Sequence, residues 1–339
     1  MPNGMPTKRI VLQIDGGGIR GITPSIVLSE LEKQIRTKRN NPRLKLYELL
    51  TLCCGTSTGA IMAGMVCVGV EGADIANFYV QDGVKLFNDS KIPWYQVPPR
   101  YDRKPFVEKF KEIITNHSEK HDRNITLNDL SGNVLFMATA YNLSSYRTHF
   151  VKSDAAGDQD LLLKDVVNWS GLSAAYYFGK VDAPAYKWIL TNADAPPREI
   201  SELGAVFQDG GQATENCTLG YVLTEILARG WANSDQVLVI SLGTGNKTLF
   251  EEYKDAKQAS EVTQAVKYIA GQARKEATPV QIMAARYVAK LNPNITIFRL
   301  DYEMDKDYQL DDIDNVAVYK QGAEKILHGS EFKNLVQAL

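Results

Sequence analysis

A serine between two glycines is the first pattern in this chain that could do chemistry. Gly55-Thr56-Ser57-Thr58-Gly59 stands between two apolar runs. A nucleophilic serine needs a tight strand-to-helix turn that exposes its Oγ, and flanking glycines keep side chains out of that turn. A helix that begins just after Ser57 would add the positive end of its dipole near developing negative charge. The pattern therefore indicates nucleophilic chemistry at Ser57.

Such a serine needs a base that takes its proton and donors that stabilise an oxyanion. None of the four histidines has a context that marks it as the base; they are His117, His121, His149 and His328. Asp209 is the other candidate, because it follows an apolar strand at 205–208, and acids at strand ends lie where α/β active sites form. Asp209-Gly210 is also a common turn, so a structural role competes with this one.

A glycine-rich loop at 16–21 (GGGIRG) follows a predicted strand near the N-terminus. It satisfies the G-x-G-x-x-G pattern of dinucleotide-binding sites. That pattern expects an acidic residue about 20 residues later, where this chain has the basic and polar run 36–41 (RTKRNN). A nucleotide-cofactor-binding module that uses this loop therefore remains an alternative function.

Three motifs taken in order resemble the patatin-like phospholipase family: Asp15 with the glycine loop, the Ser57 pentapeptide, and Asp209-Gly210-Gly211. They span residues 15–211, about 60% of the chain. The resemblance implies an α/β fold, a three-layer α/β/α hydrolase with a mainly parallel central sheet. It also implies a Ser57–Asp209 dyad that hydrolyses phospholipid esters through an acyl-serine, with no metal and no cofactor. Tyr176 departs from the family pattern, which usually has proline there, and puts only the local shape in doubt.

The same resemblance assigns supporting roles to the glycines and their neighbours. The backbone N–H groups of Gly17 and Gly18 would form the oxyanion hole, since glycine lets the main chain approach closely. The other expected site residues are loop supports (Asp15, Gly16, Arg20 and Gly21, with Arg20 also near a substrate phosphate), elbow glycines (Gly55 and Gly59) and neighbours of the base (Gly210 and Gly211).

Alternating strands and helices must position these residues. Strands are predicted at 9–15, 49–55, 134–141, 147–151, 205–208, 237–242 and 295–300. Helices are predicted at about 24–38, 60–68, 74–81, 105–115, 161–169, 219–229, 260–290 and 316–327. This alternation predicts a mainly parallel sheet between helices. We expect a single domain over 1–339, with core motifs in 9–245, loops at 88–104 and 191–204, and a helical C-terminal elaboration from about 256 to 339.

Composition narrows the classes of function. With 38 Lys+Arg and 40 Asp+Glu, the net charge of −2 argues against a protein that grips nucleic-acid polymers. The four cysteines (Cys53, Cys54, Cys67 and Cys217) form no CxxC pair, so we expect buried thiols rather than zinc ligands. Residues 49–70 carry no charge and could span a bilayer. Their glycines and polar residues favour a buried strand, turn and helix instead.

The expected site of action is a membrane surface reached from the cytoplasm. No apolar leader follows the N-terminus, so we expect a cytoplasmic protein that acts transiently at the inner membrane face. The aromatic segment 92–101, with Trp94 and Tyr95 beside Arg100, Arg103 and Lys104, is a candidate lipid contact, and a packed surface loop is its equal alternative. The basic run 33–45 is expected to be a helix C-terminus.

Regulation follows from the resemblance alone. The chain is similar to patatin-like lipases of cyclic-oligonucleotide antiphage defence, which implies a cyclic dinucleotide as candidate activator. A homo-oligomer is a candidate assembly that the sequence itself does not determine. An unregulated general esterase is the alternative.

Overall fold

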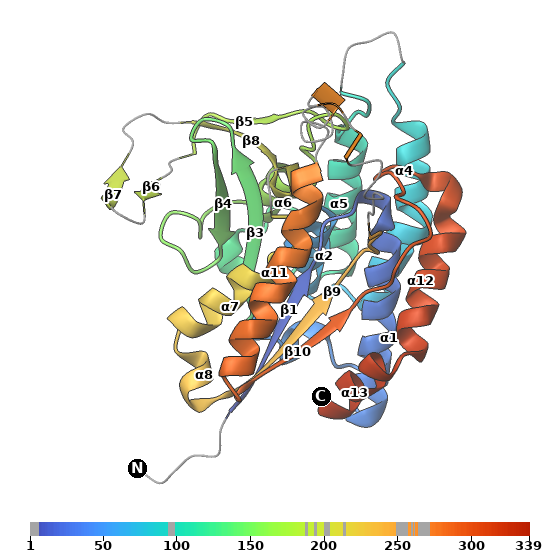
Figure 1. The fold of residues 1–339 in the computed structure, drawn as a ribbon, viewed down its shortest axis with the longest axis vertical. Helices are drawn as coiled ribbons and strands as arrows, with labels where there is room; N and C mark the ends of the chain where they lie inside the picture. Colours follow the sequence, from blue (N-terminus) through green and yellow to red (C-terminus); the bar gives the residue numbers. More distant parts are fainter. Residues whose placement is uncertain are drawn as a thin grey trace.

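A computed structural model gives the fold of the chain (Figure 1). It describes residues 7–93, 99–186, 189–192, 195–199, 204–212, 215–248, 257–258, 260, 262–263 and 272–339. The predicted lipid contacts Trp94 and Tyr95 lie outside the described residues, as does part of the predicted helix 260–290.

A sheet of eight strands forms the centre. In spatial order its strands are β10 (Ile295–Leu300), β9 (Gln236–Leu242), β1 (Lys8–Ile14), β2 (Leu52–Thr56), β3 (Leu135–Asn142), β8 (Ala205–Asp209) and β5 (Val181–Ala183), with β4 (Arg147–Lys152) also paired to β3. The strands from β10 to β3 are parallel. The pairs β3–β4, β3–β8 and β5–β8 are antiparallel. The predicted parallel sheet is therefore confirmed at its centre and turns antiparallel at one end.

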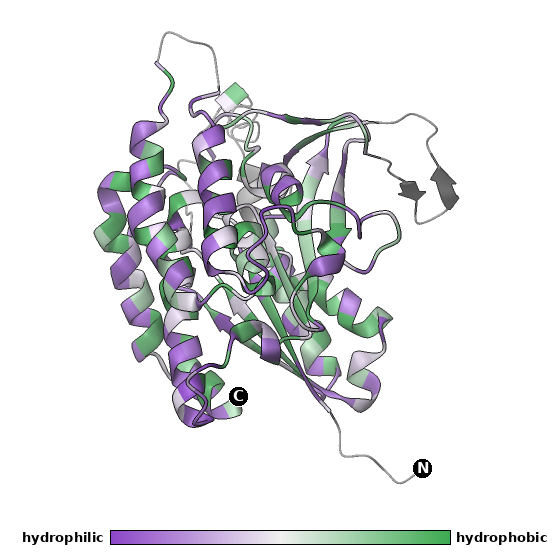
Figure 2. Cartoon of the chain, turned by 180° about the vertical axis from the view of Figure 1, so that it is seen from behind, coloured by the Kyte–Doolittle hydropathy of each residue, from purple (hydrophilic) through white to green (hydrophobic). Residues whose placement is uncertain are grey.

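Helices cover both faces of this sheet. One face carries α1 (Ile22–Lys38), α2 (Thr58–Cys67), α3 (Gly72–Asn77), α5 (Lys104–His117), α6 (Leu163–Gly171), α12 (Val316–His328) and α13 (Ser330–Ala338). The other carries α7 (Leu219–Ala228), α8 (Trp231–Ser234) and α11 (Gln272–Leu291). Strand β1 is buried on both sides, because Leu12 and Ile14 join the first core and Val11 the second. Figure 2 shows the hydrophobic strands behind helices with largely hydrophilic outer sides.

Several predicted boundaries are wrong. The helix predicted at 74–81 is longer, because it continues through a π-helical turn, Phe78–Gly83, into α4 (Val84–Asp89). The π-helical turn interrupts the 3.6-residue spacing of apolar residues, so the pattern ended before the helix did. The loop predicted at 191–204 overlaps a hairpin of β6 (Ile189–Asn192) and β7 (Ala195–Glu199). β7 pairs on one side with β6, and a strand of such a two-stranded ribbon tolerates proline. Strand β5 and helix α13 were not predicted.

The C-terminal segment belongs to the same sheet. β10 pairs with β9 from Ile295–Val237 to Leu300–Leu242, α12 packs against α1, and α13 packs against β10. The basic run 33–45 ends α1 as expected, and Lys38 and Arg39 donate to carbonyls at the end of α13.

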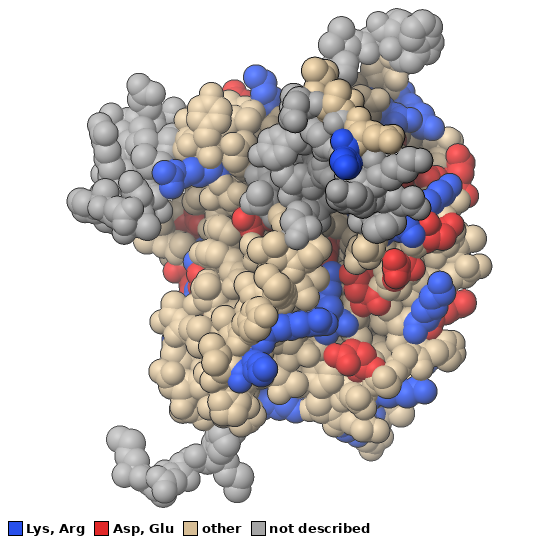
Figure 3. All heavy atoms as spheres, viewed as in Figure 1, with Lys and Arg blue, Asp and Glu red and all other residues tan. Residues whose placement is uncertain are grey.

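Residues 49–70 fold as β2, a turn at Ser57 and α2. Among the described residues, none of the helices combines the length and the apolar character that a membrane crossing requires. On the face drawn in Figure 3, basic and acidic side chains are interspersed, so that face presents no broad surface of one charge.

Candidate active site

Ser57 occupies the sharp turn between β2 and α2. Its φ of 55° is positive, a conformation that costs a non-glycine residue about 1–3 kcal/mol and persists only where the surroundings enforce it. The flanking glycines show why this turn is so tight. A Cβ on Gly55 would lie 2.2 Å from the carbonyl carbon of Gly59, and a Cβ on Gly59 would lie 2.2 Å from the carbonyl oxygen of Ile14. Both positions must therefore be glycine for β1, β2 and α2 to pack as they do.

Asp209 accepts a hydrogen bond from Ser57 and is 3% exposed. Burial raises the pKa of the Asp209 carboxyl to about 6, while hydrogen bonds from Ser57 and from the Gly211 N–H oppose that rise. The Gly211 bond is 2.8 Å long. A carboxylate with this pKa is a stronger base than an ordinary aspartate and is still mostly ionised at neutral pH.

Asp209 ends a strand, as expected, but that strand is one of the antiparallel ones. β8 runs antiparallel to β3, and Asp209 pairs with Ala140. Asp209 reaches Ser57 because Thr139 of β3 lies beside Thr56, with their Oγ1 atoms 2.6 Å apart. Gly210 permits the close approach, since a Cβ there would lie 2.3 Å from Thr139 Oγ1.

The glycine loop lies directly over Ser57. A Cβ on Gly16 would be 3.1 Å from the Ser57 Cβ. The Gly16 N–H donates to Asn216 O (3.0 Å), and the Ile19 N–H donates to Leu310 O (2.8 Å). Between them, the N–H groups of Gly17 and Gly18 donate to no acceptor in the part of the chain that the structure describes. These two N–H groups are thus available to an oxyanion.

Other parts of the chain hold this loop on its outer side. A Cβ on Gly17 would lie 2.4 Å from Thr244 Oγ1, and one on Gly18, whose φ is +57°, would lie 2.2 Å from Leu310 O. Arg20 donates from Nε to Gly17 O (3.3 Å). Gly21 meets α2, because a Cβ there would be 2.7 Å from Thr58 Oγ1. The glycine loop is packed against Ser57 on one side and against Thr244 and Leu310 on the other. This packing argues against a dinucleotide pyrophosphate bound on the loop.

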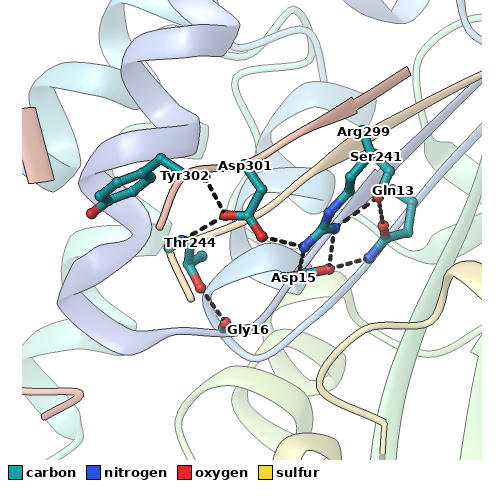
Figure 4. A network of polar contacts seen from close by, with 9 residues as sticks. Gln13, Asp15, Gly16, Ser241, Thr244, Arg299, Asp301 and Tyr302 are labelled. Atoms are coloured by element: carbon teal, nitrogen blue, oxygen red, sulfur yellow. Dashed lines mark hydrogen bonds and ion pairs between the residues drawn. The ribbon is translucent and has the colours of Figure 1, made fainter. Parts of the chain in front are cut away.

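A buried polar network supports Asp15 and was not predicted (Figure 4). Arg299 pairs with Asp15 through two hydrogen bonds of 3.1 and 2.6 Å, and Gln13 donates to the same carboxylate at 2.9 Å. The sequence contains a signal for it. Gln13 and Arg299 are polar residues inside the apolar strands KRIVLQI and ITIFRL, and a buried polar group requires a partner.

An apolar cavity of about 50 Å³ adjoins Ser57. Its wall is largely aromatic and aliphatic, formed among others by Ile61, Phe78, Phe87, Phe106, Phe178 and Leu310. A water needs about 10–15 Å³ of such space, so the cavity would hold a few waters and is too small for a fatty acyl chain. On the other side of Tyr177 and Leu310 lies an open cavity of about 470 Å³ with a mixed polar and apolar lining, whose charged residues are Arg20, Lys247, Asp15, Asp301 and Asp307.

All four histidines are engaged away from Ser57. His149 hydrogen-bonds Tyr186, and His117 pairs with Asp74 at 2.9 Å. His121 and His328 contact the backbone carbonyls of Thr115 and Glu324. The site therefore resembles a Ser–Asp arrangement and not a Ser–His–Asp one.

Two arginines of the predicted lipid contact bind other parts of the protein. Arg100 pairs with Asp311 at 2.6 Å, and Arg103 donates to the carbonyls of Phe178 and Lys180. Tyr176, at the position of the family proline, is 55% exposed. The cysteines are free and buried, and no cluster of potential metal ligands occurs within the described ranges.

Comparison with known proteins adds to this geometry. Residues 12–223 match the family model described as patatin-like phospholipase. Relatives from Solanum tuberosum include Patatin-2-Kuras 3, 27% identical over 265 residues, and Patatin, 28% identical over 266 residues. Each match covers 74% of this chain and 64% of the relative, so the chain matches slightly less than two thirds of their length.

Two solved bacterial structures are also similar. VipD from Legionella pneumophila is 14% identical with a TM-score of 0.39, over 94% of this chain and 67% of that one. Full-length ExoU in complex with SpcU, from the type III secretion system of Pseudomonas aeruginosa, is 12% identical with a TM-score of 0.36, over 85% of this chain and 53% of that one.

Proposed function

The chain belongs to the patatin-like phospholipase family, and on that premise we propose that it is a serine acyl hydrolase that cleaves phospholipid esters. One observation carries the proposal. Ser57 is held at a positive φ, hydrogen-bonded to buried Asp209, beneath the N–H groups of Gly17 and Gly18, which meet no acceptor among the described residues.

The proposed reaction has two steps that share one base. Ser57 Oγ attacks the ester carbonyl while Asp209 takes its proton, and the Gly17 and Gly18 N–H groups bind the oxyanion. The protonated Asp209 then gives its proton to the leaving alcohol, which leaves an acyl-Ser57. Water then attacks the acyl group and gives a proton to Asp209. When the second oxyanion collapses, the fatty acid leaves and Asp209 returns that proton to Ser57 Oγ. With a pKa of about 6, about nine tenths of Asp209 is ionised at pH 7.

The surroundings of Ser57 support a lipid ester as substrate. The apolar cavity places an aromatic and aliphatic wall beside Ser57, and it would have to widen to admit a fatty acyl chain. The larger cavity beyond Tyr177 and Leu310 carries charged side chains of both signs, which suits a polar headgroup; they are Arg20, Lys247, Asp15, Asp301 and Asp307. We place the action at the cytoplasmic face of a membrane, with a homo-oligomer as the proposed assembly.

Labelling with a serine-directed fluorophosphonate tests the nucleophile. Wild type should label, and Ser57→Ala should not. Release of fatty acid from phospholipid vesicles should follow the same pattern. Equal labelling of both proteins would overturn the proposal.

A second proposal concerns restraint. Leu310 lines the small apolar cavity beside Ser57, and its carbonyl accepts a hydrogen bond from the Ile19 N–H. Its neighbour Asp311 is held by Arg100 and Tyr101. A cavity too small for an acyl chain supports an enzyme that waits for an activator, and a cyclic dinucleotide in antiphage defence is the activator we propose. Vesicle hydrolysis should rise when a cyclic dinucleotide is added. Full basal activity without it would instead indicate an unregulated esterase.

A further inference from the structure

Arg299 reaches the glycine loop from the edge of the sheet. It lies on β10 opposite Ser241 of β9, which in turn lies opposite Gln13 of β1. These three side chains form a polar row across neighbouring strands, and the row ends at Asp15, the first residue after β1 (Figure 4). Ser241 accepts a 2.9 Å hydrogen bond from Arg299 and donates to Gln13. The guanidinium is therefore aimed at Asp15 by its neighbours.

A second arm of the same guanidinium holds the loop that follows β9. Arg299 Nη2 donates to Asp301 at 2.8 Å. The other oxygen of Asp301 accepts the N–H of Gly245 at 3.0 Å. Thr244, the residue before Gly245, donates to Gly16 O at 2.7 Å and fills the space beside Gly17. One side chain thus holds the glycine loop directly through Asp15 and also through the loop that covers it.

The ion pair between Arg299 and Asp15 is buried and stays charged. The Arg299 side chain is 7% exposed and that of Asp15 is 4% exposed. Burial would lower the pKa of Arg299, but Asp15 and Asp301 outweigh that effect and hold it above the ordinary value, so the side chain stays charged. The planar fork of arginine can bind both oxygens of Asp15 at once, which the single ammonium of lysine cannot reproduce.

We propose that Arg299 is the positioning residue of the oxyanion hole, an inference that rests on the proposed function of Ser57. Arg299 touches no reacting atom. It fixes Asp15 and Thr244, and these fix the backbone of Gly16 and Gly17, so that two N–H groups point to the place where the oxyanion forms. A misplacement of 1 Å in such a group can cost about 10²-fold in rate.

The test compares Arg299→Lys with a matched control, Arg229→Lys. Arg229 makes the same kind of contact elsewhere, a two-bond pair with Asp154 and a third bond to Glu225. With a soluble short-chain ester, Arg299→Lys should lower kcat by about 10- to 100-fold at nearly unchanged KM, whereas Arg229→Lys should stay within about twofold of wild type. Thermal unfolding of both variants shows how much each pair contributes to stability.

A second readout separates positioning from mere stability. A thionoester places sulfur where the oxyanion forms and gains less from hydrogen-bond donors than the oxygen ester does. The ratio of oxoester to thionoester rates should therefore fall in Arg299→Lys and remain unchanged in Arg229→Lys. Asp301→Asn keeps the shape of the side chain but weakens its contact with Arg299. It should lower the same ratio of rates by a smaller factor, and it replaces Arg299→Lys as the test if that variant does not fold.

An unchanged ratio in a folded Arg299→Lys or Asp301→Asn protein, with wild type active and Ser57→Ala inactive, overturns this inference and leaves the proposed function intact. Activity that persists in Ser57→Ala overturns the proposed function, and this inference with it.

Discussion

Ser57 donates a hydrogen bond to Asp209, although Ser57 follows a parallel strand and Asp209 ends an antiparallel one. The two residues meet because Thr56 and Thr139 bring β2 and β3 together and Gly210 lets β8 close on Thr139. The dyad is therefore a product of sheet pairing, and its chemistry depends on how deeply that pairing buries the carboxylate.

Activity should depend on pH through Asp209. The base must be ionised, and burial raises the pKa of Asp209 to about 6. We expect kcat/KM for a soluble ester to rise about tenfold per pH unit below this value and to level off above pH 7. A pH–rate profile in the absence of membranes measures it. A limb that breaks near pH 4 would show that Asp209 is more solvated than its burial indicates.

Asp209→Asn should abolish turnover and stabilise the fold. A carboxyl whose pKa is raised on folding binds its proton more tightly in the folded state, so wild-type stability falls as pH rises from about 4 to above 6. Asparagine removes this penalty, which is on the order of 2–3 kcal/mol for a shift of this size. Urea unfolding at pH 8 and pH 4 should show the gain at the higher pH only. An equal difference at both pH values would contradict the assignment.

Gly55→Ala should disrupt the elbow. The new Cβ would meet the Gly59 carbonyl carbon at 2.2 Å, and backbone on both sides cannot yield without moving Ser57. We expect a loss of about 1–3 kcal/mol or more in the free energy of unfolding, together with lost fluorophosphonate labelling. Gly83→Ala is the matched control, because its Cβ would lie 3.4 Å from its nearest neighbour, the Phe78 carbonyl oxygen, which is an ordinary van der Waals contact. Denaturant titration compares them, and equal losses would show that the crowding at Gly55 is relieved locally.

The local part of this site could be predicted from the sequence. The Ser57 pentapeptide and the glycine loop are each a short contiguous motif, and a strand-to-helix turn has a signature within five residues. The sequence also marks Asp209 as a candidate base, but it does not give the direction of its strand, since a short apolar run does not reveal whether it pairs parallel or antiparallel. The assignment of catalytic roles to these residues, and of one domain to the chain, remains a prediction.

The long-range part could not be predicted. Arg299 and Leu310 act on the glycine loop from the C-terminal third, where no motif marks them. Their roles depend on β10 pairing with β9 and on a segment that returns across Gly18. Such contacts are specified by the packing of the whole sheet, so a sequence pattern can flag a polar residue in an apolar strand but cannot name its partner.

Leu310→Ala should enlarge the apolar cavity beside Ser57. Leu310 lines both this 50 Å³ cavity and the 470 Å³ cavity outside it, so truncation of its side chain should join the two. The backbone bond from Ile19 to Leu310 O remains, which leaves the glycine loop in place. We expect basal hydrolysis of long-chain phospholipid vesicles to rise at least about fivefold, because access and not chemistry limits the closed form. A short-chain soluble ester should be hydrolysed at nearly the wild-type rate. Leu327→Ala, a partly buried leucine of α12, controls for lost stability. A Leu310→Ala protein that gains nothing on vesicles would mean that the closed cavity opens freely without help from this side chain.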